Sequence, residues 1–244
     1  MTADSRPLAV VTGGSRGIGR AFVLEAVRRG YDVVFSYRSR EADADETVEL
    51  AAALGGEAES VRADLENLEG VHTLASVAHA KGEVSLLVNN AGIGEEFTLE
   101  ELTRETWERS VAINLTAPTF LAKEFKADLV ARRGAILNVS SDGGVAGSLH
   151  GAAYGATKAG LIGLTKTLAR ELAPHVRCNA IAPGPVATEM WFAIDPAVQQ
   201  QVMEREMPLK RIAQPEDIAR AGLDISSWPD ASGIVVLLDG GRIM

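Results

Sequence analysis

Short apolar runs alternate along this chain with longer amphipathic stretches. The runs at 8–11, 32–36, 85–88, 135–139, 176–181 and 233–238 are nearly continuous in apolar residues. Such runs are typical of strands that are covered on both faces, as in a parallel sheet. A further strand is expected to end within Arg62-Ala63-Asp64-Leu65.

Helical segments lie between these strands, and we predict them at 17–30, 41–54, 120–132 and 154–172. The first carries Ile18, Phe22 and Ala26 at helical spacing and ends at Gly30. The alternation predicts an α/β protein with a doubly wound parallel sheet, the Rossmann fold, and helices on both faces. No repeat or linker divides the 244 residues, so we expect one domain spanning 1–244.

Composition and charge exclude several classes of protein. The formal net charge of −9 argues against a nucleic-acid partner, which usually selects a basic face. The single cysteine, Cys178, fits a small buried side chain and a reducing compartment. No signal peptide or membrane span is evident, and His72, His79, His150 and His175 lack metal-ligand spacing. We therefore expect a cytoplasmic protein with no metal site.

A glycine-rich turn follows the first strand. Gly13, Gly17 and Gly19 join that strand to the first helix, the context in which glycines bring the backbone close to a pyrophosphate. Ser15 and Arg16 then fall in the loop, near the adenosine end of a dinucleotide. The alternative is a tight turn that needs its glycines only for packing.

The second strand bears on the choice of nicotinamide cofactor. It is followed by Arg38, and no carboxylate appears before Glu41 to accept the ribose hydroxyl of NAD. Arg38 and Arg16 would suit a 2′-phosphate, which indicates NADP, while Arg40 is placed less favourably. The alternative for Arg38 is a solvated surface side chain. Asp64 would either accept from the adenine amino group or close an ordinary strand-end turn.

Tyr154 and Lys158 are four residues apart and fall on one face of a predicted helix. A phenol titrates near pH ~10, and a neighbouring ammonium lowers its pKa by favouring the phenolate. Tyr154 would thus donate a proton with Lys158 tuning it. The alternative is an ordinary half-exposed pair on a helix.

At this point the chain resembles the short-chain dehydrogenase/reductase family over nearly its whole length. The shared motifs are Thr12 to Gly19, Asn89-Asn90-Ala91-Gly92, Asn114, Ser141 placed thirteen residues before Tyr154, Tyr154 with Lys158, and Pro183-Gly184 with Thr188. The resemblance implies an oxidoreductase with Asn114, Ser141, Tyr154 and Lys158 as catalytic residues. It also implies that NADP(H) is bound by Gly13, Ser15, Arg16, Gly17, Ile18, Gly19, Arg38, Asp64, Leu65, Asn90, Ala91, Gly92, Tyr154, Lys158, Pro183, Gly184, Val186 and Thr188.

Within the family, the chain is most similar to 3-oxoacyl-[acyl-carrier-protein] reductases, on segments such as 158–163, 207–212, 215–219 and 239–241. This implies NADPH-dependent reduction of a 3-oxoacyl thioester, as in fatty acid biosynthesis. The alternative is a carbonyl reductase or secondary-alcohol dehydrogenase acting on a polyketide, sugar or other small ketone. A catalytically silent nucleotide sensor would not need the tyrosine and lysine. Departures from the family pattern occur at Asp142, which bears on the substrate pocket, and at 223–229 and 231–234.

The segment 185–211 is expected to form a lid over the substrate. Its apolar members suit an acyl chain, or else they pack the lid onto the core: Met190, Trp191, Phe192, Ile194, Val198, Val202, Met203 and Met207. An acidic carrier protein would need a basic patch, for which Arg132, Arg133, Lys126 and Arg170 are candidates; the alternative is a solvated helix end. His175 stands where carrier-protein reductases tend to have an extra basic residue, which weakens the carrier-protein interpretation. The resemblance also implies a homotetramer with interfaces at 120–132, at 154–172 and at the last strand.

Overall fold

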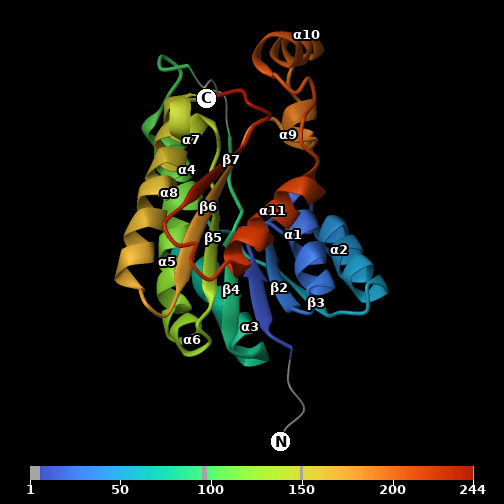
Figure 1. Ribbon diagram of the computed structural model, residues 1–244, viewed down its shortest axis with the longest axis vertical. Coiled ribbons are helices and arrows are strands. Elements are labelled where there is room, and N and C mark those ends of the chain that lie inside the picture. Colours follow the sequence, from blue (N-terminus) through green and yellow to red (C-terminus); the bar gives the residue numbers. More distant parts are fainter. Residues whose placement is uncertain (1–5, 95–97, 149–150, 244) are drawn as a thin grey trace, which may run out of the picture.

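Seven parallel strands form one sheet at the centre of the computed structural model, which describes residues 6–94, 98–148 and 151–243. The order across the sheet is β3-β2-β1-β4-β5-β6-β7 (Figure 1). The strands are β1 (Leu8–Val11), β2 (Asp32–Tyr37), β3 (Ala58–Arg62), β4 (Val84–Asn89), β5 (Ala135–Val139), β6 (Arg177–Pro183) and β7 (Val235–Leu238). This is the doubly wound sheet that the alternating pattern predicted.

The strand order reverses between β1 and β4. From β1 the chain runs outward to β3 and then returns to place β4 on the other side of β1, with Val10 between Val34 and Leu87. The loops after β1 and β4 therefore leave the sheet in opposite directions. A crevice opens at the carboxyl ends of the strands at such a point, and ligands of these sheets bind there.

Two helical layers cover the sheet (Figure 1). One face of the sheet packs on α1 (Gly17–Arg28), α2 (Glu41–Ala53) and α11 (Pro215–Ser227), and the other on α3 (Leu68–Lys81), α5 (Ala117–Glu124), α6 (Lys126–Ala131) and α8 (Ala152–Glu171). Successive side chains of a strand point to opposite faces. In β1, Ala9 and Val11 belong to the first core, whereas Leu8 and Val10 belong to the second. Both layers need an apolar strand surface, which explains the continuous apolar runs.

The helix expected at 120–132 is wrong in its bounds. The helical path begins with α4 (Arg104–Val111), passes through a π-helical turn η1 (Ala112–Thr116) and continues as α5 and α6. Phe125 separates α5 from α6, with φ −90° and ψ 4°, and its ring is fully buried. The strand expected to reach 62–65 ends at Arg62, and α3 was not predicted at all.

The segment between β6 and α11 forms a helical projection over one end of the sheet. It contains α9 (Glu189–Phe192), α10 (Pro196–Gln201) and a π-helical turn η2 (Val202–Glu206). Trp191, Val202 and Met207 form a small core of their own there. Met190, Phe192 and Val198 are instead exposed. The apolar residues expected in the lid thus divide between internal packing and free surface.

The structure also describes the environment of the single cysteine and the length and polarity of the helices. Cys178 is fully buried, and burial raises the pKa of its thiol to about 12, as suits a small core side chain. Within the described residues, none of the helices is both long and apolar enough to cross a membrane.

Candidate active site

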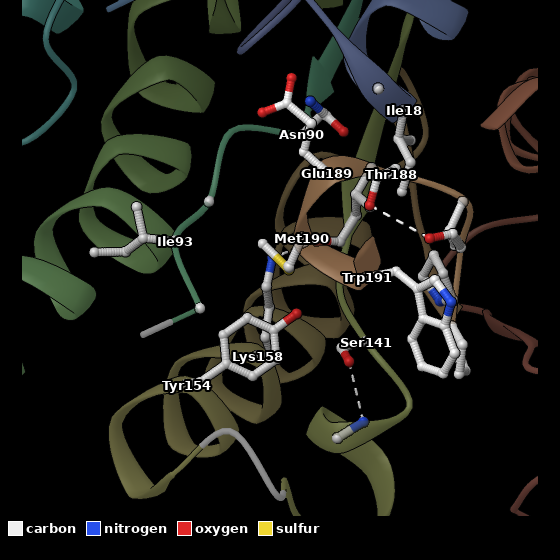
Figure 2. Close-up of a pocket in the computed structure, with 18 of the residues that line it drawn as sticks. Ile18, Asn90, Ile93, Ser141, Tyr154, Lys158, Thr188, Glu189, Met190 and Trp191 are labelled. Carbon is white, nitrogen blue, oxygen red and sulfur yellow. Dashed lines mark hydrogen bonds between the residues drawn. The ribbon is translucent and has the colours of Figure 1, made fainter. Parts of the chain in front are cut away.

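A large cavity lies at the carboxyl ends of the strands, with a volume of about 1820 Å³. Every residue that the sequence predicted for cofactor binding lines it, from Gly13 on the glycine loop to Thr188 beside the lid. Ser141 lines it as well, whereas Asn114 does not. Figure 2 shows Tyr154 and Lys158 rising from one helix toward Ser141, with Met190 and Trp191 of α9 on another side.

The glycine loop is built so that side chains would not fit. A Cβ on Gly19 would lie 1.9 Å from the carbonyl oxygen of Gly13, and one on Gly14 would lie 2.7 Å from the Phe35 ring. Gly13 and Gly17 have φ of 68° and 53°, a region that glycine tolerates best. The loop opens α1 without an acidic residue in the first turn. Its backbone amides can thus face an anion, which fits the pyrophosphate of a dinucleotide.

Asn90 fastens this loop to the end of β4. Its side-chain amide donates to the carbonyl oxygens of Thr12 and Gly13 at 2.9 and 3.3 Å. The Thr12 hydroxyl accepts in turn from the amides of Asn90 and Ala91, both at 2.9 Å. The Asn90 side chain is therefore occupied in shaping the cavity, and its backbone and that of Ala91 and Gly92 form the wall.

Three arginines beside the glycine loop and after β2 line the cavity and have different partners. Arg16 and Arg40 both pair with Glu189 of α9, the second at 2.9 Å. Arg38 is exposed, lines the cavity and has no ion pair in the part of the chain that the structure describes. Arg38 is thus available for a phosphate, as expected, whereas Arg16 is shared with the lid, a contact that the sequence did not predict.

Asp64 serves the turn that follows β3. Its carboxylate accepts from the amide of Glu66 at 3.0 Å, and its backbone carbonyl lies where a Cβ on Gly70 would meet it at 2.0 Å. Asp64 and Leu65 also line the cavity. The turn contact therefore accounts for one carboxylate oxygen of Asp64, and the expected contact with adenine stays a prediction.

The proposed catalytic pair sits between α8 and the segment after β5. Lys158 is 4% exposed, and its ammonium donates to the carbonyl oxygen of Val139 at 2.9 Å and lies 5.7 Å from the centre of the Tyr154 ring. The Ser140 hydroxyl donates to the Lys158 carbonyl at 2.8 Å, which ties β5 to α8. These contacts bring Ser141, Tyr154 and Lys158 to one point of the cavity wall.

Burial dominates the proton equilibria of this pair. It lowers the pKa of Lys158 to about 8, because the ammonium loses its hydration. It also raises the pKa of the Tyr154 phenol; a hydrogen bond with Ser141 lowers that pKa, and the charge of Asp142 raises it. The expectation that Lys158 lowers the pKa of the phenol is therefore wrong for this structure, in which desolvation outweighs any attraction across 5.7 Å.

Asn114 lies in the π-helical turn η1 and is 1% exposed. Its side-chain oxygen accepts from the Ile93 amide at 2.9 Å, and its amide donates to the Ile93 carbonyl at 2.9 Å and to the Thr157 hydroxyl at 3.1 Å. A Cβ on Gly92 would lie 3.2 Å from the Asn114 oxygen and 3.1 Å from the Lys158 ammonium. Asn114 thus holds the segment after β4 beside Lys158 and does not line the cavity itself. A π-helical turn often marks a functional position.

The lid side of the cavity begins directly after β6. Gly184 packs so closely that a Cβ would lie 2.9 Å from Asp239 and 3.3 Å from the Asp142 carboxylate. Val186 forms a β-bridge with Ala213, and a Cβ added at Gly17 would lie 3.4 Å from the methyl carbon of Thr188. Pro183, Gly184, Val186 and Thr188 are therefore placed between the catalytic residues and the glycine loop.

The lining residues that the sequence analysis did not single out include the charged side chains of Glu189, Glu206 and Arg242. Arg242 bridges Glu206 of the lid and Asp142, at 2.7 and 2.8 Å. Of the residues in this contact, the sequence analysis identified only Asp142, as a departure from the family pattern. Because the partners are as far apart as 100 positions, no local pattern indicates the contact.

The arginines considered for carrier-protein docking lie at the other end of the molecule. Arg132 and Arg133 precede β5, whereas Ser141 follows it. The five residues of β5 span about 17 Å. A carrier docked on Arg132 and Arg133 would have to present its acyl group around the edge of the sheet or to another subunit.

Known proteins share this architecture. The family described as short chain dehydrogenase matches residues 7–199. A 3-oxoacyl-[acyl-carrier-protein] reductase of Synechocystis sp. is 37% identical over the full length of both chains. Among solved structures, a blue fluorescent protein from a metagenomic library, in complex with NADPH, is 30% identical with a TM-score of 0.91 and covers 98% of each chain. Acetoin dehydrogenase of Salmonella typhimurium is 29% identical with a TM-score of 0.86 and covers 97% of each chain.

Proposed function

Since this chain belongs to the short chain dehydrogenase family of oxidoreductases, we propose that it reduces a ketone to a secondary alcohol with NADPH. The observation that carries the proposal is the convergence of Ser141, Tyr154 and Lys158 on the cavity that the glycine loop also lines. We further propose a 3-oxoacyl thioester on acyl carrier protein as the substrate, on the strength of the full-length similarity to such a reductase.

The residues of the cavity divide the work of binding the cofactor. The glycine loop and the start of α1 would hold the pyrophosphate, and Arg38, with Arg16, the 2′-phosphate. Thr188 would reach the carboxamide of the nicotinamide ring, and Lys158 the adjoining ribose. When bound, the nicotinamide supplies the hydride. The residues of the cavity position the substrate oxygen and supply its proton.

The proton comes from Tyr154 in this scheme. As hydride reaches the carbonyl carbon, charge develops on the oxygen, and a donor placed there in advance stabilises it. Tyr154 transfers its phenolic proton to that oxygen, while the Ser141 hydroxyl helps to hold it. Burial raises the pKa of Tyr154, so the phenol is protonated at neutral pH and has a proton to give.

The decisive experiment follows NADPH absorbance with acetoacetyl-acyl carrier protein, a short pantetheine-like acetoacetyl thioester, ethyl acetoacetate and acetoin, each repeated with NADH. Rapid oxidation of NADPH on the carrier-bound thioester would support the full proposal. Absence of turnover with every ketone would overturn it. Tyr154→Phe is the matched control, since it should bind NADPH normally and lose at least 10²-fold in kcat.

A second candidate is reduction of a small polar ketone. The cavity wall beside Ser141 carries Asp142, Arg242 and Glu206, charged groups that an extended acyl chain does not need. The similarity to acetoin dehydrogenase is in keeping with this alternative. Turnover of acetoin with little activity on either thioester would favour it.

A further inference from the structure

Three charged side chains from distant parts of the chain meet beside the catalytic serine. Arg242 donates to Asp142 at 2.8 Å and to Glu206 at 2.7 and 2.8 Å. Asp142 follows β5, Glu206 ends η2 within the lid, and Arg242 follows β7. Their side chains are 9%, 34% and 20% exposed, so the Asp142–Arg242 pair is largely shielded from water.

The backbone fixes where Arg242 points. The Asp239 carboxylate accepts from the amides of Gly241 and Ile243 at 2.9 and 2.7 Å. Gly240 and Gly241 have φ of 68° and 83°, which lets the chain turn tightly there. Arg242 is therefore held in its orientation by the turn as well as by its two ion pairs.

Asp142 passes this contact on to Ser141. One carboxylate oxygen binds Arg242, and the other accepts from the Ser141 hydroxyl at 3.0 Å and from the Gly143 amide at 2.7 Å. The Gly143 amide also donates to the Ser141 oxygen at 3.1 Å, as Figure 2 shows. A hydroxyl has one proton to give. Asp142 thus competes with the phenol or the substrate oxygen for the proton of Ser141.

The charge of Asp142 also reaches Tyr154. It opposes the phenolate form, in addition to burial, which is the larger cause of the raised pKa of Tyr154. Arg242 offsets that charge. The other ionisable groups on this side of the cavity include Lys158 of α8 and Glu189, Asp195, Arg205 and Glu206 of the lid, and Asp239 lies beside Gly184 after β7. Glu95, Glu96 and His150 lie outside the described residues.

We propose that Asp142 is a positioning residue that acts on the reaction through Ser141 and Tyr154, and that Arg242 and Glu206 set its place and its effective charge. The role deepens the proposed function and rests on it for its kinetic consequences. A carboxylate buried beside the serine without a partner would be costly, so Asp142 depends on Arg242 for its place. The wall acts as one unit that joins the lid, the end of β7 and the catalytic serine.

The first test needs no substrate. The chain has only three tyrosines, so near-ultraviolet absorbance of the phenolate, with Tyr154→Phe subtracted, isolates the titration of Tyr154. Asp142→Asn should move this titration to lower pH by about half a unit or more, because a negative neighbour is lost. Arg242→Met should move it to higher pH by a similar amount, because Asp142 and Glu206 lose their counter-charge. The double variant should fall between the two.

The opposite signs separate this role from a merely structural one. If the substitutions acted only through loss of packing, the titration of Tyr154 would move in the same direction in both variants or would not move. Either result would overturn the proposal. Glu204→Gln, an exposed neighbour of Glu206 on the lid, is the matched control and should titrate as the wild type does. If Arg242→Met fails to fold, Arg242→Lys keeps the charge and should stay near the wild type while Asp142→Asn still shifts.

The second test uses the reverse reaction, oxidation of a secondary alcohol with NADP⁺. Its rate should rise with pH as Tyr154 becomes phenolate, and the acid limb of kcat should follow the titration in both variants, with KM for NADP⁺ changed less than twofold. If neither variant moves that limb, Asp142 does not act through Tyr154. Glu95→Gln and Glu96→Gln, added to both variants, should leave the difference in the acid limb between Asp142→Asn and Arg242→Met unchanged. Failure of the proposed function would appear separately, as absence of turnover in the wild type.

Discussion

At the scale of single residues, the site depends on groups whose ionisation is set by burial. Lys158 is the extreme case: the residue is 4% exposed, and its ammonium donates a hydrogen bond to the Val139 carbonyl. The sequence placed Tyr154 and Lys158 on one helical face correctly. It could not tell that desolvation would dominate both, because burial depends on segments far away in the chain.

The lowered pKa of Lys158 makes a prediction about stability. Its folded pKa of about 8 lies below the ordinary value of 10.5, so between these values the unfolded chain binds more protons than the folded one. Stability contributed by this group therefore rises with pH over that window and is lost as pH falls through it. Urea unfolding from pH 8 to 10.5 should show the wild type gaining roughly 2 to 3 kcal/mol relative to Lys158→Met. A constant difference between the two proteins would contradict this.

Arg38 should decide between the two nicotinamide cofactors. It is exposed on the cavity wall and is not engaged in an ion pair with any described residue, whereas Arg40 already pairs with Glu189 and Asp43. Arg38→Ala should lower kcat/KM for NADPH by about tenfold or more and leave that for NADH nearly unchanged, because only NADPH carries the 2′-phosphate. Arg40→Ala is the matched control with a smaller effect. Equal losses with both cofactors would remove Arg38 from this role.

At the scale of elements, the strands and the glycine loop follow from the sequence because each depends on local demands. Strands buried on both faces leave apolar runs, and the contact of Gly19 with Gly13 leaves no room for a side chain. The π-helical turn η1 leaves no such trace, so the helix around Asn114 could not be bounded. Likewise the Asp142–Arg242 pair depends on the meeting of segments that only the folded sheet brings together.

The glycine loop should not tolerate even a methyl group. In Gly19→Ala the Cβ would lie 1.9 Å from the Gly13 carbonyl and 2.6 Å from the Asn90 amide. We expect NADPH affinity to fall by at least tenfold, by titration of cofactor fluorescence, as the loop is pushed from the end of β4.

Gly30, just after the other end of α1, supplies the matched control. It has φ of 86° and open space around it. Gly30→Ala should cost about 1 kcal/mol of stability and leave NADPH affinity intact. Equal affinities in the two variants would mean that the loop yields to the added methyl group.

At the scale of the whole molecule, we expect two surfaces to contact further copies of the chain. β7 is an edge strand whose side chains are incompletely covered, with Leu237 38% exposed. Small residues recur on the exposed side of α8, at Ala152, Ala156, Ala159 and Gly163. These are the two regions that the family resemblance implied for a homotetramer.

A charge on the edge strand should break one of these contacts. Leu237→Arg should reduce the molar mass in solution from a tetramer to a dimer, since edge strands resist pairing when charged. Light scattering after gel filtration measures this. Leu54→Arg, at the end of α2 and 41% exposed, is the matched control and should keep the wild-type mass. A tetramer that survives Leu237→Arg would place the interface elsewhere.

The central pairing of β1 with β4 also governs how the molecule is assembled. The two strands register Val10 with Leu87, and between them lie β2, α2, β3 and α3. During synthesis β1 and β2 can pair early, but β1 cannot pair along its other edge until β4 has been synthesised. The loop between β1 and β4 must close before their contacts can stabilise the fold. Folding should therefore be slow compared with that of a protein whose contacts are mostly local. A ribosome-bound chain that ends before β4 would expose an apolar edge, which a holding chaperone would recognise.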